Sequence, residues 1–297
     1  MRIICANHGA LPVDDVPSNS ALRAALQVQQ QAGLDVVTDG QLGWPDPITP
    51  FLAPLDGIRL GGPCALPLGL GLAAQPIVQA KLRRHHPLLI DAFRCAAALT
   101  SLPLKVTITG PYTLAHAAEV GTTAYRQRAD LAADLSGLLA QEVSALVTAG
   151  VRLLQIDEPL LLAAPHDARL VRTLLEPLVD AAGAAAARVI VATYGADAGD
   201  CYAQLNTLPG DIVAVDCAAG PAIVEAIAAT GSGKPLALGI VDAAAPRLDD
   251  EATLRRLRDR LLRRYGHDEV WLQPSRGLAG MTMQQAGAKL RQLVSLR

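Results

Sequence analysis

Two adjacent carboxylates, Asp157 and Glu158, are the residues in this chain whose types and position most clearly suggest chemistry. They follow the short apolar run Leu153–Ile156, which is typical of a buried strand, and Pro159 stops that run abruptly. In parallel α/β proteins, ligands bind beyond the carboxyl ends of the strands. A carboxylate in that place can carry out acid–base chemistry or orient a cationic group of a substrate.

Similar polar side chains follow the other apolar runs of the chain, so a site built from several strand ends is expected. These candidates are His8, Asp39, Gln41, Tyr112, Thr113, Tyr194, Asp216, Asp242, Gln273 and Arg276. Arg276 has the donor geometry to clamp a carboxylate or a phosphate. Asp216 precedes Cys217, but no histidine lies at metal-ligand spacing from this pair, so we expect no metal there.

Each candidate also has a purely structural interpretation. Asp157 or Glu158 could cap the next helix or pair with a neighbouring arginine, and His8 could be a solvated loop residue beside Gly9. Arg276 could be an ordinary surface arginine. We favour a site role for Asp157 because it lies nearer the strand.

Composition narrows the class of protein. The 297 residues contain 26 basic and 28 acidic side chains and no basic run, so nucleic acid is not an expected partner. The five cysteines are scattered without a C-x-x-C spacing, which favours a reducing compartment. No stretch of about 20 apolar residues lacks Gly, Pro or charge, so no membrane span is expected. The composition and the absence of a signal-peptide pattern favour a cytoplasmic location.

Apolar runs alternate with helical patterns along the whole chain, as expected for a repeated βα unit. The predicted strands are Ile3–Ala6, Val36–Thr38, Lys105–Thr109, Leu153–Ile156, Val189–Ala192, Ile212–Val215, Pro235–Ile240 and Val270–Leu272. Eight such units in about 300 residues predict one closed (β/α)8 TIM barrel over residues 1–297. An open doubly wound sheet is the alternative, but no G-x-G-x-x-G follows the first strand.

Three further expectations concern the surroundings of the site. The Gly/Pro-rich excursion at about 42–75 should form a lid or a hairpin over it. Lys81–Leu99 has helical spacing, with His85 and His86 on a solvated basic face. Lys105 begins its strand, so we expect it at the opposite end of the barrel from the site, on the face that serves stability.

Several of these elements resemble the single-barrel form of cobalamin-independent methionine synthase and, beyond it, the uroporphyrinogen decarboxylase-like barrels. The similarity covers essentially the whole chain in the right order. It is carried by Asp39-Gly40, Thr109-Gly110-Pro111-Tyr112-Thr113, Gln155-Ile156-Asp157-Glu158-Pro159, Asp242…Pro246-Arg247 and Trp271-Leu272-Gln273-Pro274…Gly277-Leu278. The resemblance implies a barrel that transfers a methyl group from a reduced folate or a corrinoid carrier to a thiol.

The resemblance also implies a zinc ion, which binds the acceptor thiolate in that family through a His and a Cys, a Glu, and a second Cys. Here the His-x-Cys element reads Val191-Ala192-Thr193, the glutamate falls on Asp216 and the last cysteine on Arg276. These side chains cannot form a tetrahedral zinc site, so zinc is not expected. Of the amino-acid contacts, only Asp157 is retained, because the amino-group glutamate falls at or near Gln41.

Three hypotheses follow for a small-molecule-binding barrel of this kind. The first is a methyltransferase-family enzyme that uses another acceptor or a corrinoid or partner protein, with Asp157, Glu158 and Asp216 as catalytic candidates. The second is a zinc-free lyase or decarboxylase of the same superfamily. The third is a non-catalytic barrel subunit, because Thr193-Tyr194-Gly195 resembles a run in the zinc-free N-terminal barrel of long methionine synthases.

Overall fold

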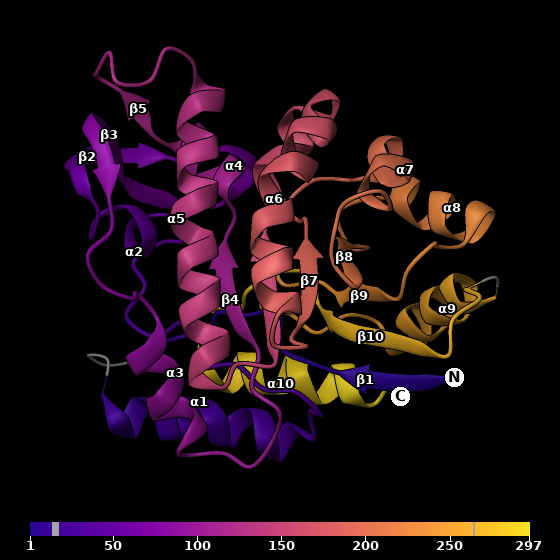
Figure 1. Ribbon diagram of the computed structural model, residues 1–297. Coiled ribbons are helices and arrows are strands. Elements are labelled where there is room, and N and C mark those ends of the chain that lie inside the picture. Colours follow the sequence, from indigo (N-terminus) through magenta and orange to yellow (C-terminus); the bar gives the residue numbers. More distant parts are fainter. Residues whose placement is uncertain (14–17, 264) are drawn as a thin grey trace.

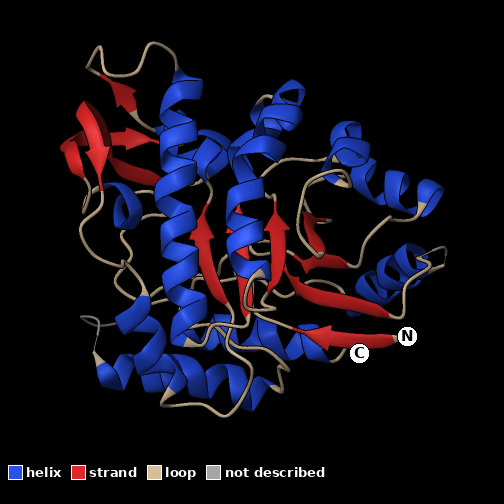
Figure 2. Cartoon of the chain, in the orientation of Figure 1, coloured by secondary structure: helices blue, strands red, loops and turns tan. Residues whose placement is uncertain are grey.

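Seven parallel strands form the central sheet of this computed structural model, which describes residues 1–13, 18–263 and 265–297. In sheet order they are β1 (Arg2–Cys5), β10 (Glu269–Pro274), β9 (Leu236–Val241), β8 (Ile212–Asp216), β7 (Arg188–Ala192), β6 (Leu153–Asp157) and β4 (Val106–Thr109) (Figure 1). Parallel strands in one sheet need a crossover between them, and helices supply most of these crossovers (Figure 2).

Two single backbone bridges join the outer strands of the sheet. Ala6, directly after β1, pairs with Val36, and Val37 pairs with Leu104, two residues before β4; both bridges are parallel. Residues 36–37 thus take the place of the strand predicted at Val36–Thr38, and the ring of strands is complete. The predicted (β/α)8 barrel is confirmed.

The helices lie outside this ring. They are α1 (Asn19–Ala32), α2 (Thr49–Leu52), α3 (Ile90–Ala97), α4 (Pro111–Ala117), α5 (Arg128–Ala149), α6 (Ala168–Gly183), α7 (Tyr202–Leu205), α8 (Pro221–Thr230), α9 (Glu251–Leu262) and α10 (Met283–Val294). Ser18 caps α1 by accepting a hydrogen bond from the Ala21 N–H, and Gly33 ends it with φ 86°. The helical spacing of Thr253–Tyr265 predicts a helix that crosses residue 264, which lies outside the described residues. No described helix is long and apolar enough to cross a membrane.

The Gly/Pro-rich excursion forms an antiparallel hairpin of β2 (Asp56–Ala65) and β3 (Leu72–Arg83), to which the short strand β5 (Glu119–Val120) adds in parallel. The helix predicted over Lys81–Leu99 is wrong in its first half. Residues 81–83 belong to β3, because pairing with β2 overrides the helical spacing, and Pro87 prevents a helix from running through to Ile90. His85 therefore lies in the connection to α3, where it pairs with Asp56.

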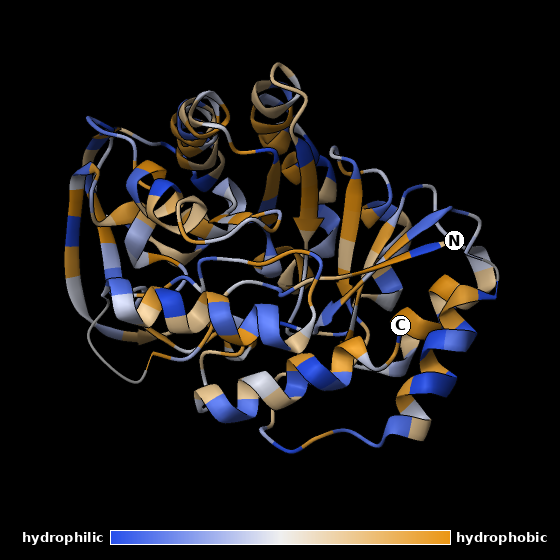
Figure 3. Ribbon diagram, turned by 90° about the horizontal axis from the view of Figure 1, so that it is seen from below, coloured by the Kyte–Doolittle hydropathy of each residue, from blue (hydrophilic) through white to orange (hydrophobic). Residues whose placement is uncertain are grey.

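Alternation along the strands divides the buried residues into two layers. An inner cluster fills the barrel and includes Ile4, Leu153, Ile212 and Trp271. A larger outer cluster packs the strands against the helices, whose polar faces point to solvent (Figure 3). In β6, residues 153, 155 and 157 face inward, so the next residue, Glu158, faces the helical layer.

Candidate active site

A cavity of about 690 Å³ opens at the carboxyl ends of the barrel strands. Five predicted site residues line it, namely His8, Gln41, Asp157, Tyr194 and Arg276. The tip of the β2–β3 hairpin adds Gly69, Leu70 and Gly71, and the loop before α2 adds Trp44, Pro45, Asp46 and Pro47. A charged and hydrogen-bonding floor under partly apolar walls is the usual character of a small-molecule site.

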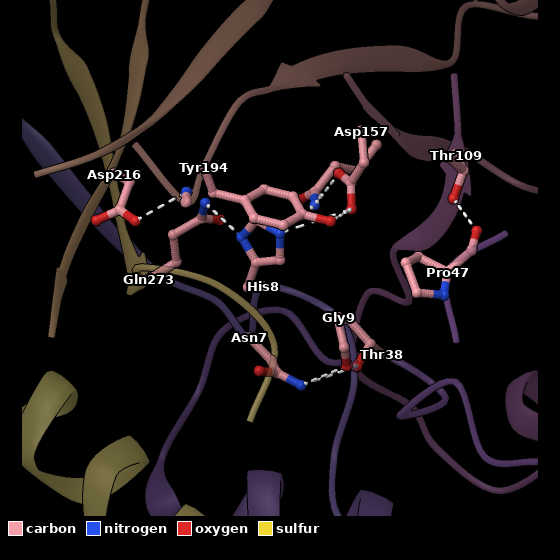
Figure 4. Close-up of polar contacts among 12 residues, drawn as sticks. Asn7, His8, Gly9, Thr38, Pro47, Thr109, Asp157, Tyr194, Asp216 and Gln273 are labelled. Atoms are coloured by element: carbon pink, nitrogen blue, oxygen red, sulfur yellow. Dashed lines mark hydrogen bonds and ion pairs between the residues drawn. The ribbon is translucent and has the colours of Figure 1, made fainter. Parts of the chain in front are cut away.

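Asp157 contacts three polar side chains at the floor of this cavity (Figure 4). Its Oδ1 accepts a hydrogen bond of 2.8 Å from Gln155 Nε2, and its Oδ2 accepts one of 3.4 Å from the Tyr194 hydroxyl. His8 Nε2 lies 3.6 Å from Oδ2. Burial and the negative charge of Asp157 raise the pKa of Tyr194 well above its ordinary value, so this phenol remains a neutral donor.

Lys105 does not lie on the distant stability face, and that prediction is wrong. Its side chain is fully buried, and its ammonium donates a hydrogen bond to Gln155 Oε1. Lys105 belongs to the inward-facing set of its strand, so its long side chain extends through the barrel interior rather than away from it. Burial lowers the pKa of Lys105 to about 7, although the negative charge of Asp157 offsets part of this shift.

Glu158 lies outside the barrel, between β6 and α4, and does not line the cavity. Its carboxylate accepts hydrogen bonds from the backbone N–H groups of Tyr112 (3.0 Å) and Thr113 (2.7 Å) in the first turn of α4. Burial raises the pKa of Glu158 to about 7. A Cβ at Gly110 would lie 2.2 Å from Glu158 Oε1, so the glycine at this position makes room for the carboxylate. Glu158 thus caps the preceding helix rather than the following one.

Tyr112 and Thr113 also face away from the cavity. The Tyr112 hydroxyl donates to Asp167 Oδ2 at 2.8 Å, and its ring stacks on His116 with centroids 3.9 Å apart. Thr113 is fully buried beside Glu158, and its hydroxyl accepts a hydrogen bond from Leu160. The motif Gly110-Pro111-Tyr112-Thr113 therefore builds the support of the site rather than its surface.

Three other predicted residues lie near the mouth without lining the cavity. Asp39 Oδ1 accepts from the Gln41 N–H at 2.9 Å, and burial raises the pKa of Asp39. Asp242 Oδ1 accepts from the Ala244 N–H at 2.7 Å. Gln273 Nε2 lies 3.2 Å from His8 Nδ1, inside the barrel. Asp39 thereby holds Gln41 in a left-handed backbone conformation, with φ 52°.

The positions that correspond to the zinc ligands of the similar family do not fit a zinc ion here. Asp216 is the single carboxylate among them, and it already accepts hydrogen bonds from the N–H groups of Gly195, Ala218 and Ala219. Thr193 and Arg276 are not zinc ligands. In the part of the chain that the structure describes, no group of three or more His, Cys, Asp or Glu side chains could hold a metal ion.

Sequence reasoning missed Lys105 and Gln155 as parts of the site. The signal for Gln155 was present, because a residue two positions before Asp157 on a strand points to the same side. Lys105 gave no comparable signal, since a lysine at the start of a strand is exposed in most proteins.

Comparisons with known proteins agree with this architecture. Residues 11–296 match the sequence model of the family described as "Cobalamin-independent synthase, Catalytic domain". The methionine synthase of Saccharolobus solfataricus is 28% identical over 278 residues, which are 93% of this chain and 82% of the relative. The methionine synthase of Methanothermobacter marburgensis is 27% identical over 279 residues, which are 92% of this chain and 87% of the relative.

Solved structures show the same fold. A B12-independent methionine synthase from Shewanella, in complex with selenomethionine, superposes with a TM-score of 0.84 at 19% identity and covers 98% of this chain and 95% of its own. A protein from Listeria monocytogenes, described as a putative vitamin-B12 independent methionine synthase, reaches 0.68 at 18% identity with the same two coverages. Because the family model spans nearly all of its residues, this chain belongs to the catalytic-domain family of the cobalamin-independent synthases.

Proposed function

We propose that this chain is an enzyme that transfers a methyl group from a reduced folate to a small acceptor, and that it does so without a zinc ion. The acceptor is a zwitterionic molecule, either an amino-acid-like thiol or another amino-acid-like compound. The observation that carries this proposal is a cavity lined by the carboxylate of Asp157 and the guanidinium of Arg276. The other carboxylate in the lining, Asp46, already accepts hydrogen bonds from Ile48 and Thr49.

The two charged groups have complementary roles toward such an acceptor. The Asp157 carboxylate binds its ammonium group, and hydrogen bonds from Tyr194 and Gln155 hold that carboxylate in place. Arg276 binds the acceptor's anionic group, with its positive charge held at the rim of the cavity. Selenomethionine in the Shewanella protein is an amino acid of the kind that this pair of charges would recognise.

The family name supports the choice of donor. Relatives described as cobalamin-independent or B12-independent give a corrinoid carrier no support, so reduced folate is the donor we propose. Methyl transfer to sulfur needs a thiolate, and the positive charge of Arg276, while it binds the acceptor's anionic group, would also favour the ionised form of the thiol across the cavity. Zinc plays no part in the proposal, because the side chains at the corresponding positions are an arginine, a threonine and an aspartate that is already hydrogen-bonded.

Calorimetry and an activity assay test this proposal together. Homocysteine and a methylated reduced folate should each bind the purified protein, and mass spectrometry should detect the methylated acceptor when both are present. Elemental analysis should find no stoichiometric zinc in active protein. Asp157→Asn should weaken binding of homocysteine, and Asp56→Asn is its matched control, because Asp56 is an exposed carboxylate on the hairpin that pairs with His85 outside the cavity.

Other outcomes would contradict the proposal in different ways. Stoichiometric zinc would refute the zinc-free site. Turnover that follows the ionisation of one carboxylate, needs no folate and is insensitive to chelators would favour a lyase or decarboxylase. Co-purification with a partner protein, without binding of either small molecule, would favour a non-catalytic barrel subunit.

A further inference from the structure

A row of buried polar side chains crosses the barrel interior beneath the cavity. It runs from Lys105 through Gln155 to His8 and ends at Gln273 (Figure 4 shows its His8–Gln273 end). All four side chains are almost completely buried: Lys105 and Gln155 are 0% exposed, Gln273 1% and His8 3%. Buried polar groups of this kind are expensive unless their donors and acceptors match, so their orientations are strongly constrained.

Lys105 and Asp157 fix the orientation of the Gln155 amide from its two ends. The Asp157 carboxylate can only accept hydrogen bonds, so the amide nitrogen faces it. The Lys105 nitrogen donates to the carbonyl oxygen, which both its ammonium form and its amine form can do. The amide nitrogen of Gln155 then faces the site, 2.8 Å from Asp157 Oδ1 and 3.3 Å from His8 Nε2. Its two N–H groups supply one donor for each of these acceptors.

This orientation also assigns the tautomer of His8. If Nε2 accepts from Gln155, the neutral ring carries its proton on Nδ1. The Gln273 amide must then turn its oxygen toward Nδ1. In the structure, Gln273 Nε2 faces His8 Nδ1, and Gln273 Oε1 is buried without a partner among the described residues. Reversing the amide gives that oxygen a donor, the Nδ1–H of His8.

We propose that Lys105 is a positioning residue: through the Gln155 amide it sets the hydrogen bond to Asp157 and keeps His8 in the Nδ1–H tautomer. Lys105 itself does not line the cavity, so it acts on a ligand only through these neighbours. The effect on ligand binding rests on the proposed function, but the effect on His8 does not. The tautomer can be measured in the ligand-free protein, so the two ideas fail separately.

The direct test is nitrogen NMR of the full chain labelled with 15N-histidine, near neutral pH. The chain has six histidines, and loss of one ring signal in His8→Gln identifies the wanted resonances. In the wild-type protein we expect Nδ1 to resonate as the protonated nitrogen and Nε2 as the unprotonated one. The reverse pattern in the wild type would overturn the proposal without any further variant.

Two lysine variants separate positioning from stability. Lys105→Met should shift part of the His8 population toward the Nε2–H tautomer, because Gln155 loses the donor to its carbonyl oxygen and is then held by Asp157 alone. Lys289→Met is the matched control: Lys289 is also fully buried, but it pairs with Asp249 on the outer layer and should leave the His8 signals unchanged. An unchanged His8 spectrum in folded Lys105→Met would refute the proposal.

A third variant covers the case in which Lys105→Met does not fold. Gln155→Glu keeps a charged partner for Lys105 but has no N–H to offer to His8, so it should also move the ring proton to Nε2. His8 retaining the Nδ1–H tautomer in this variant would count against the proposal. If homocysteine binds the wild type, Lys105→Met should weaken it about tenfold, which corresponds to about 1.4 kcal/mol.

Discussion

Asp157 and Glu158 are neighbours in the chain, yet they serve two different regions of the molecule. Asp157 faces the barrel interior, where hydrogen bonds from a side chain of β6 and from one in the loop after β7 hold it at the floor of a cavity. Glu158 faces the outer layer, where it binds two backbone N–H groups of α4. The difference teaches that the pleat of a strand can place one carboxylate in a cavity and the next one in the packed layer of helices.

The largest expected effect concerns the inner carboxylate. Asp157→Ala should weaken binding of the zwitterionic acceptor about 100-fold, or about 3 kcal/mol, because the ligand's ammonium group loses its partner in a partly dry cavity. The free energy of unfolding should change little. Calorimetry and urea unfolding measure the two quantities, with Asp56→Ala as the exposed control. Affinity within threefold of wild type would place the ligand elsewhere.

The outer carboxylate should show the reverse pattern. Glu158→Ala leaves two buried N–H groups of α4 without acceptors, so the free energy of unfolding should fall by about 2 kcal/mol. Gly110→Ala should be at least as damaging, since its Cβ would overlap the Glu158 carboxylate. Acceptor affinity of the folded fraction should stay near the wild-type value. A loss of affinity without a loss of stability would erase the contrast between the two carboxylates.

Lys105 gives the inner region a distinct dependence of stability on pH. Its pKa is about 7 in the folded protein and 10.5 for the ordinary amine, so between these values the unfolded chain binds more protons on this lysine. The contribution of Lys105 to the free energy of unfolding therefore rises as the pH increases from about 7 to 10.5. Relative to Lys105→Met, the wild-type free energy of unfolding should increase by about 2 kcal/mol from about pH 7 to pH 9. Urea unfolding at both pH values measures it, and a constant difference would contradict the burial-shifted amine.

The smallest effect should come from the hairpin side of the cavity. Gly195 has φ +89°, and a Cβ there would lie 3.1 Å from the Leu68 carbonyl oxygen at the hairpin tip. Gly195→Ala should cost about 1 kcal/mol of stability and change acceptor affinity only two- to threefold. Thermal unfolding and calorimetry check this result. A large loss of affinity with intact stability would show that the tip contributes more to binding than Asp157's surroundings do.

Much of this architecture was predictable because it depends on period and order along the chain. The alternating runs predicted the barrel and its strand ends, and Asp157, expected at the end of its strand, lines the cavity. The local pattern failed where tertiary pairing decides the outcome, as at Lys81–Arg83, which joins β3 instead of a helix. Lys105 and Glu158 were misjudged because polar side chains near strand ends are exposed in most proteins, and only the packed layers reveal which ones are buried.

The two single bridges at residues 36–37 have a further consequence for how the mouth can change over evolution. Sheet pairing ends at Thr38, because the Gln29 amide of α1 occupies both the N–H and the C=O of that residue. The loop that begins with Asp39 and Gln41 therefore starts from a helix contact rather than from a strand ladder. Insertions and exchanges in this loop can reshape one wall of the cavity while every other strand pair of the barrel keeps its register.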